Sequence, residues 1–303
     1  DIANGYVDLA TGALTDGTTY LITARLIDEA GNTSTPSASF TVTVDTTAPS
    51  APAITSVTDD TGSVTGALTA GVRTDDTNLL VRVSLAATGA VAGDQVRLYD
   101  GTTAIGVAVT LTAADITAGF LDIATGSLAE ATYSINAKVI DIAGNASAAS
   151  PGFALTVDTT APNAPSIASV TDDVGTLTGA LAGGARTDDT NLAVRVSLTG
   201  TGAIAGDSAR LYNGSTALGA AVVLTSTDIT NGYVTIATGV LTDAAYALNA
   251  RVIDIAGNAS AASSNFNFTV DTVAPNAPSI TSVSDDVGTI TGALTTGART
   301  DDT

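Results

Sequence analysis

The sequence predicts an all-β protein in which immunoglobulin-like β-sandwich domains follow one another in a linear array. The first reason is a repeat: Val-Asp-Thr-Thr-Ala-Pro at 44–49 returns at 157–162 and, with one substitution, at 270–275, so the period is 113 residues. The second reason is that each period holds about seven short strand-like segments and no convincing helical pattern. The third is composition, because Thr and Val favour strands while Gly, Asn and Asp favour turns.

The repeat divides the chain into two complete modules and two incomplete ones. Complete modules are expected at 48–160 and 161–273, and each is long enough to bury a core of its own. Residues 1–47 correspond to the last part of a further module, and residues 274–303 correspond to the opening of another. Neither terminal piece is expected to close a core.

The strands of the first complete module are expected between turn-rich segments. The segment 59–77 is rich in Gly, Thr and Asp and is expected to be a long loop. Apolar and mostly polar residues alternate over 79–85, as in a strand with one solvated face. Asp100-Gly101 predicts a tight hairpin, and Asn213-Gly214 repeats it. The seven predicted strands are 53–58, 78–86, 94–99, 103–112, 120–124, 132–141 and 153–157.

A tyrosine at the start of the penultimate strand favours an immunoglobulin-like sandwich. Tyr133 holds this place in the first complete module, and Tyr20 and Tyr246 correspond to it. The position is typical of a tyrosine corner, in which the hydroxyl bonds to backbone a few residues upstream. The alternative is an ordinary half-buried strand tyrosine.

The composition limits which partners the chain can bind and which chemistry it can perform. The chain has 30 acidic and 10 basic residues and a net charge of −20, so nucleic acid and anionic membrane are poor partners. No apolar run approaches the ~20 residues of a membrane span, so no membrane insertion is expected. Cys, His and Met are absent, so any metal must be bound by oxygen. With Lys138 as the single lysine, a nucleophile lacks an obvious base, and no enzyme activity is expected.

Sandwich topology predicts that three acidic segments meet at the junction between modules. The loop after the first strand lies at the C-terminal end of its module, where the last strand also finishes, at the linker aspartate. The turn between the last two strands of the next module lies at that module's N-terminal end and faces the same junction. At the central junction these segments carry Asp59, Asp60, Asp75 and Asp76, then Asp158, then Asp254 and Asn258.

A hard divalent cation would relieve the repulsion among such carboxylates. Calcium is the expected ion, because it accepts about 6–8 oxygen ligands in flexible geometry, and magnesium ranks second. A cation bridging two modules and their linker would stiffen the array into a rod. The alternative is that these segments are turns stabilised by their own side chains. The corresponding candidate ligands elsewhere are Asp45, Asp141 and Asn145, and Asp172, Asp173, Asp188, Asp189 and Asp271.

An ordered set of motifs runs through the whole chain: Val-Asp-Thr-Thr-Ala-Pro, Ser-Val-Thr-Asp-Asp-x-Gly, Thr-Asp-Asp-Thr, Leu-Tyr-(Asp/Asn)-Gly and Asp-Ile-Ala-Gly-Asn-Ala-Ser. It resembles the bacterial immunoglobulin-like repeats of giant type I-secreted adhesins and biofilm-associated proteins. The resemblance implies a stalk that projects an adhesive domain from the cell surface, with calcium at the junctions. One departure is that Thr-Asp-Asp-Thr is often followed by Pro in that family, but by Asn78 and Asn191 here. The family's metal-bearing positions match Asp158 and Asp59, Asp60, Asp75 and Asp76.

The expected function is therefore that of spacer repeats in an extracellular adhesin on a bacterial cell surface. Such repeats would contact neighbouring repeats of the same chain and support attachment and biofilm formation. Binding to a host or abiotic surface would occur through domains outside this sequence. One alternative is that the repeats themselves bind carbohydrate or self-associate between cells. Another is an accessory array on a secreted enzyme or a phage fibre.

Overall fold

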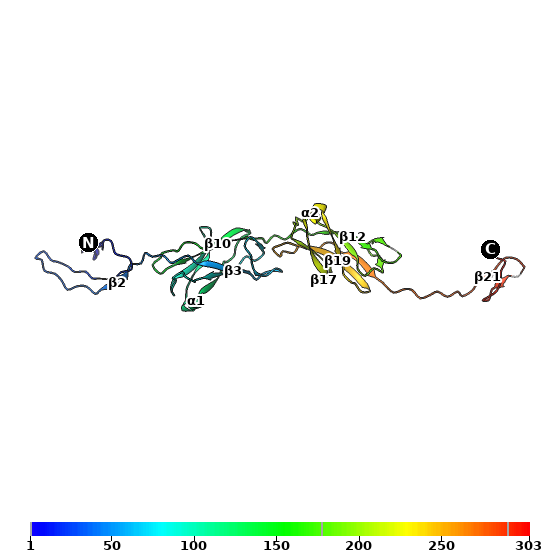
Figure 1. Cartoon of the computed structure of the whole chain (residues 1–303), viewed down its shortest axis with the longest axis horizontal. Helices are drawn as coiled ribbons and strands as arrows, with labels where there is room; N and C mark the ends of the chain where they lie inside the picture. Colours follow the sequence, from blue (N-terminus) through cyan, green and yellow to red (C-terminus); the bar gives the residue numbers. More distant parts are fainter. Residues whose placement is uncertain (1, 177, 290) are drawn as a thin grey trace.

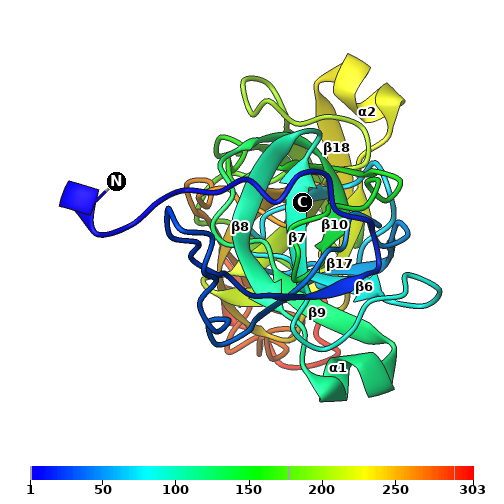
Figure 2. The ribbon, with the colours of Figure 1, turned by 90° about the vertical axis from the view of Figure 1, so that its left-hand side faces the viewer.

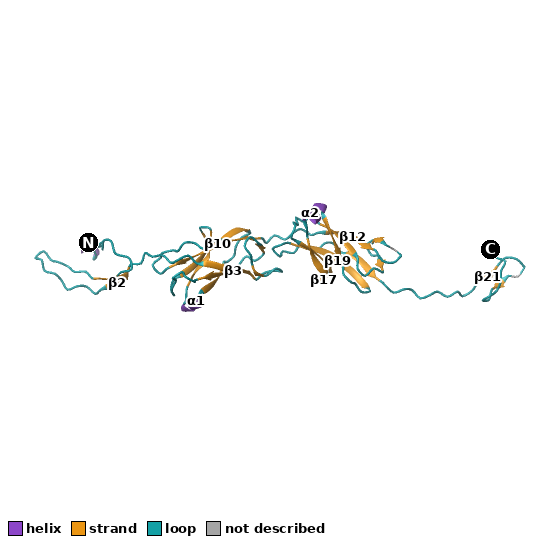
Figure 3. Ribbon diagram, in the orientation of Figure 1, coloured by secondary structure: helices purple, strands orange, loops and turns teal. Residues whose placement is uncertain are grey.

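Two β-sandwiches lie in single file along the chain (Figure 1). The structure is a computed structural model that describes residues 2–176, 178–289 and 291–303. Almost all of its regular structure is strand, and loops form most of the two terminal segments (Figure 3). The chain is therefore an all-β protein built from immunoglobulin-like sandwiches, as the sequence predicts.

The first sandwich consists of a four-stranded sheet in the order β4-β3-β6-β9 and a five-stranded sheet in the order β5-β11-β10-β7-β8. Neighbouring strands are antiparallel, except that β5 runs parallel to β11. All its strands fall inside the range 48–160. The strands are β3 (Ala53–Asp59), β4 (Gly66–Ala67), β5 (Arg73–Thr74), β6 (Leu80–Ser84), β7 (Gln95–Asp100), β8 (Thr103–Thr110), β9 (Phe120–Ala124), β10 (Ala131–Ile140) and β11 (Phe153–Val157).

The second sandwich repeats this topology inside the range 161–273, with sheets β13-β12-β15-β18 and β14-β20-β19-β16-β17. Its strands are β12 (Ser166–Asp172), β13 (Gly179–Ala180), β14 (Arg186–Thr187), β15 (Ala193–Ser197), β16 (Ser208–Asn213), β17 (Thr216–Val223), β18 (Tyr233–Ala237), β19 (Ala244–Ile253) and β20 (Phe266–Val270). The terminal segments hold η1 (Ile2–Asn4), the pair β1 (Thr19–Ile22) and β2 (Phe40–Thr43), and the pair β21 (Ser284–Asp285) and β22 (Gly292–Ala293). In the first pair the apolar side chains of Leu21 and Phe40 are exposed.

Two of the predictions about these elements are wrong. The segment 59–77 is not only a loop, because it contains the short strands β4 and β5, which extend one edge of each sheet. Each module also contains one short helix, α1 (Ala113–Ala118) and α2 (Ser226–Asn231). In α1, Thr112 and Asp115 form a reciprocal capping box, and Gly119 ends the helix at φ 75°. The two helices project from opposite sides of the array (Figures 1 and 2).

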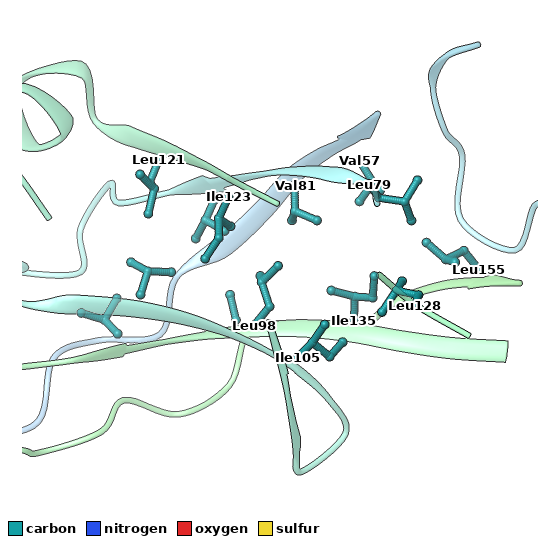
Figure 4. Close-up of a cluster of buried hydrophobic side chains, with 14 of the residues drawn as sticks. Val57, Leu79, Val81, Leu98, Ile105, Leu121, Ile123, Leu128, Ile135 and Leu155 are labelled. Carbon is teal, nitrogen blue, oxygen red and sulfur yellow. The ribbon is translucent and has the colours of Figure 1, made fainter. Parts of the chain in front are cut away.

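The core of the first sandwich is made of aliphatic side chains from its two sheets (Figure 4). Val57 and Val81 come from the four-stranded sheet, Leu98 and Ile135 come from the five-stranded sheet, and all four are fully buried. Burying one such side chain stabilises the fold by about 1.5–3 kcal/mol. The alternation of inward and outward residues along β6 is the pattern on which the strand prediction rested.

The tyrosine corner is confirmed in both sandwiches. The hydroxyl of Tyr133 donates to the backbone oxygen of Ala129 at 2.9 Å, and that of Tyr246 donates to the oxygen of Thr242 at 2.9 Å. The bond ties the start of the penultimate strand to the segment before it. In the part of the chain that the structure describes, no helix has the length and apolar character needed to cross a membrane.

Candidate functional site at the module junction

The linker between the two sandwiches is held by side chains of the first module. Arg73 donates from Nη1 to Oδ2 of Asp158 at 2.7 Å. Glu130 accepts hydrogen bonds at Oε2 from the hydroxyls of Thr159 and Thr160, at 3.1 and 2.8 Å. The repeated linker motif therefore folds back onto its own module through both its aspartate and its threonines.

The same linker is also held by the second module. The side-chain amide of Asn258 donates to the backbone oxygen of Asp158 at 2.8 Å. Asn163 donates from its backbone to the oxygen of Thr201 at 2.8 Å and from its side chain to the oxygen of Gly200 at 3.0 Å. With contacts on both sides, the linker has little freedom to act as a hinge.

The two modules also touch each other directly. The hydroxyl of Ser63 in the first module donates to the backbone oxygen of Gly257 in the second at 3.0 Å. A Cβ atom added to Gly257 would lie 3.3 Å from Oδ2 of Asp75. The loop after the first strand, the linker and the turn of the next module therefore meet at one junction, as sandwich topology predicts.

Asp75 is the carboxylate that lies between the modules. Its Oδ1 atom is buried and has no hydrogen-bond partner. Burial raises the pKa of Asp75 above its usual value, and the nearby carboxylates of Asp59, Asp254 and Asp76 raise that pKa further. Gly62, at φ 74°, leaves room for this carboxylate, because a Cβ there would overlap it. The site is thus an unpaired, partly buried negative charge.

Asp188, which lies one period after Asp75, shows how much the neighbouring module contributes to the burial of Asp75. It has the same loop and the same glycine neighbour, Gly175. Asp188 is exposed, whereas Asp75 is half-buried. The burial of Asp75 therefore comes from its place at the junction and not from its own loop.

Most other predicted ligands are hydrogen-bonded inside their own module. Asp59 accepts from the hydroxyl of Thr74 and from the backbone of Thr61, and Asp76 accepts from the backbones of Asp60 and Asn78. A proline in place of Asn78 would lack the donor of the last bond. In the second module Asp172 and Asp189 make the corresponding bonds, and Asp60 and Asp173 are exposed.

The Asp-x-Ala-Gly-Asn turn is also closed by its own side chains. Asp254 accepts the backbone N–H of Asn258 at 2.8 Å and its side-chain amide at 2.9 Å. Asp141 and Asn145 pair in the same way, and the side-chain amide of Asn145 lowers the pKa of Asp141 below its usual value. This turn is therefore stabilised by its own side chains, which is the alternative to metal binding that the sequence analysis left open.

The linker aspartates have partners as well. Asp158 is paired with Arg73, and Asp271 is paired with Arg186 at 2.6 Å. Asp45 accepts from the backbone of Thr47 at 3.0 Å. At Asp158 and Asp271, a guanidinium thus supplies the positive charge that the sequence led us to expect from calcium.

Only a small part of the predicted ligand set at this junction is therefore free to hold a calcium ion. Among the described residues no group of three or more acidic side chains is arranged to hold a metal ion. The buried Oδ1 of Asp75 has no partner and is a hard oxygen donor of the kind that calcium takes. Asp75, with the neighbouring Asp254, is the part of the predicted ligand set that fits such an ion.

Sequence reasoning missed a buried aspartate next to the junction. Asp207 accepts the backbone N–H groups of Ile204 and Ile255 at 2.8 and 3.1 Å, and burial raises its pKa. Together with Arg73 and Asp158 it lines an open hollow of about 430 Å³. The available signal was Ala-Gly-Asp at 205–207, which also stands one period earlier.

The chain is similar in sequence to part of one curated protein. No protein family model matches it. Over 271 residues it is 35% identical to Exoglucanase B of Cellulomonas fimi, and the match covers 86% of this chain and 21% of that protein. The chain thus spans about a fifth of the length of the curated relative that it matches.

Solved structures with a similar fold include modules from two kinds of protein. The fibronectin(III)-like modules of Clostridium thermocellum CbhA are 14% identical, with a TM-score of 0.44 over 71% of this chain and 93% of that one. A Ca2+-stabilized adhesin that helps an Antarctic bacterium bind ice is 21% identical, with a TM-score of 0.38 over 84% of this chain and 57% of that one. The similarity to both is one of fold.

Proposed function

We propose that this chain is a spacer segment of a bacterial cell-surface adhesin and supports attachment and biofilm formation. The observation that carries this is the linker at Asp158, which is bonded to Arg73 of one module and to Asn258 of the next. A linker tied on both sides favours single-file modules that hold a distal domain away from the surface. The partners are neighbouring repeats, and a host or abiotic surface is reached through domains outside this sequence. The location is extracellular, after type I secretion.

Calcium stiffens the junctions in this proposal. The unpaired Oδ1 of Asp75 and the nearby Asp254 support it. When bound, the ion supplies positive charge that removes the repulsion among these carboxylates. The chain's own contribution is to position Asp75 above Gly62 and against Gly257, and to hold the linker through Arg73.

An accessory array on a secreted enzyme is the second candidate, and the similarity to Exoglucanase B favours it. That match covers 21% of the enzyme, and we assign no catalysis to this segment. In both candidates the sandwiches act as a spacer. The sequences that flank the array distinguish the two, because an adhesin continues into further repeats and an enzyme into a catalytic domain.

Small-angle scattering of the whole chain tests the spacer function. The expected maximum dimension is that of modules in single file, and it should be the same at low and high protein concentration. Calcium should narrow the distribution of dimensions and raise the melting temperature, and a chelator should reverse both effects. A chain whose modules fold against each other side by side would contradict the spacer function. Insensitivity to calcium and chelator would contradict the stiffening alone.

A further inference from the structure

The basic residues of this chain are confined to four positions of the repeat. There are 10 of them against 30 acidic residues, so each cation stands out in a strongly negative chain. At each of these four positions, every repeat that the sequence includes carries a basic residue. The four sets are Arg73, Arg186 and Arg299; Arg82 and Arg195; Arg97 and Arg210; and Arg25, Lys138 and Arg251.

In the two complete modules, the first two sets have clear partners within the fold. Arg73 and Arg186 pair with the linker aspartates. Arg82 forms a bidentate pair with Asp122, with both distances at 2.7 Å. Arg195 lies over the ring of Tyr233, 3.4 Å from its centre. These cations hold the linker and the outer face of the four-stranded sheet.

In the two complete modules, the residues of the other two sets face each other. Arg97 on β7 is directly opposite Lys138 on β10, and Arg210 on β16 is directly opposite Arg251 on β19. Like charges directly opposite on one face of a sheet destabilise it. Within the described part of the chain none of the four forms an ion pair with a carboxylate. Arg210 donates to the backbone oxygen of Gly219 at 3.2 Å and Arg251 to that of Ser260 at 3.4 Å, so neither of these contacts neutralises a charge. Both sandwiches therefore keep a like-charged pair that has no carboxylate partner.

Each pair lies next to a tyrosine. Lys138 Nζ is 5.3 Å from the ring centre of Tyr99, and Arg251 Cζ is 5.7 Å from that of Tyr212. Tyr99 and Tyr212 are half-buried, so part of each ring reaches solvent.

Each tyrosine is directly opposite an asparagine, Asn136 or Asn249, whose buried Oδ1 has no hydrogen-bond partner. One face of each module thus combines two cations with an aromatic ring and an amide.

We propose that these two faces, β7–β10 and β16–β19, bind an acidic polysaccharide. The cations would meet the carboxylates of uronic acid units, and the tyrosine ring would contact the apolar side of a pyranose. The argument is charge complementarity at sites that recur once per module, which suits a polymer that presents a carboxylate on successive sugars. Attachment through the repeats themselves goes beyond the spacer function and does not depend on calcium.

The net charge of −20 does not prevent this binding. The screening length is about 8 Å at physiological salt, so the acidic loops at the module ends have little effect on the middle of the sheet. A second copy of this chain is a poorer occupant. Asp59, Asp76 and Asp254 are already hydrogen-bonded in their own turns, and the exposed Asp60, Asp173 and Asp188 offer carboxylates at the module ends and not along a polymer.

Binding of the whole chain to polygalacturonate, measured by calorimetry in chelator, tests the proposal. The double variant Arg97→Gln/Arg210→Gln should lose at least about tenfold in affinity, equivalent to about 1.4 kcal/mol. The matched control Arg82→Gln/Arg195→Gln changes the net charge equally and should keep its affinity. Lys138→Gln/Arg251→Gln is a second, independent test of the same faces. Melting of each variant confirms that it is folded.

Several results would overturn the proposal. One is equal loss of affinity in the control and the test variants, which would mean that only overall charge matters. Another is equal binding of fully methyl-esterified polygalacturonate or of polyglutamate, since the first lacks the charge and the second lacks the sugar. Absence of binding by the native chain would also reject it. If sedimentation shows that the chain self-associates through Arg97 and Arg210, the occupant is a second copy and not a polysaccharide.

Discussion

The side chain of Asn258 donates a hydrogen bond to the backbone oxygen of Asp158 across the junction, at 2.8 Å. Asn145 makes the same bond to Asp45 at 3.0 Å, one module earlier. Each asparagine is oriented by the aspartate four residues before it in the same turn. The turn therefore has a mechanical role, because it fixes the direction in which the preceding linker enters the module.

Replacing Asn258 with alanine should loosen the junction without unfolding either sandwich. The linker oxygen loses one hydrogen bond, which is worth about 1 kcal/mol. Small-angle scattering in chelator should show a broader range of dimensions. Asn32→Ala is the matched control, because Asn32 closes the same turn but its side-chain bond goes only to Asp28. Equal broadening in both variants would refute the clamp.

Gly62→Ala should weaken the loop that holds Asp75. An alanine at φ 74° is strained by about 1–2 kcal/mol, and its Cβ would also overlap the Asp75 carboxylate. Gly89→Ala is a control for the backbone strain, because Gly89 has φ 75° and open space around the added Cβ. The melting temperature should fall further for Gly62→Ala, and its calcium affinity should fall as well. Equal melting temperatures would show that the Asp75 carboxylate moves freely.

The raised pKa of Asp75 makes the calcium-free junction pH-dependent. Because that pKa is higher in the docked state, Asp75 contributes stability that is greatest below its unfolded pKa of about 3.9 and is lost as pH rises through the docked value. Asp75→Asn should therefore melt at a higher temperature than the native chain at neutral pH in chelator. The difference should shrink as pH falls toward about 4. A difference independent of pH would contradict this assignment.

Tyr133→Phe should destabilise the first sandwich by about 1 kcal/mol, the value of one neutral hydrogen bond. The loss concerns the bond from the hydroxyl to Ala129, and the ring keeps its packing. Tyr246→Phe should cost the second sandwich at least as much, because the Tyr246 hydroxyl donates to the backbone oxygen of Thr242 and also accepts from its N–H. Denaturant unfolding measures both. If neither variant loses stability, the corner bond is not a stabilising feature of these modules.

The sequence predicted the strands well because one face of each strand is buried. In β6 the buried Val81 and Val83 alternate with outward residues, and Asp100-Gly101 marks the hairpin to β8. It did not predict α1, because a helix of six residues shows less than two turns of periodicity. The signal that was available is the capping pair Thr112 and Asp115.

The sequence also predicted which segments meet at the junction, because strand direction fixes the end of the sandwich on which each loop lies. It did not predict which carboxylates are already bonded. Arg73 reaches Asp158 from 85 residues away, so no local pattern reveals that pair. Asp75 differs from the other candidate ligands through its contact with Gly257 of the next module. That contact exists only in the packed junction, so the sequence does not reveal it.

Calcium titration of Asp75→Asn beside Asp188→Asn tests the central claim most directly. The two aspartates hold the same place in the repeat, but only Asp75 is covered by a following module. Calorimetry on the whole chain should show that Asp75→Asn removes a calcium-binding event and that Asp188→Asn keeps it. If both variants bind calcium like the native chain, the proposed stiffening of this junction by calcium at Asp75 is wrong.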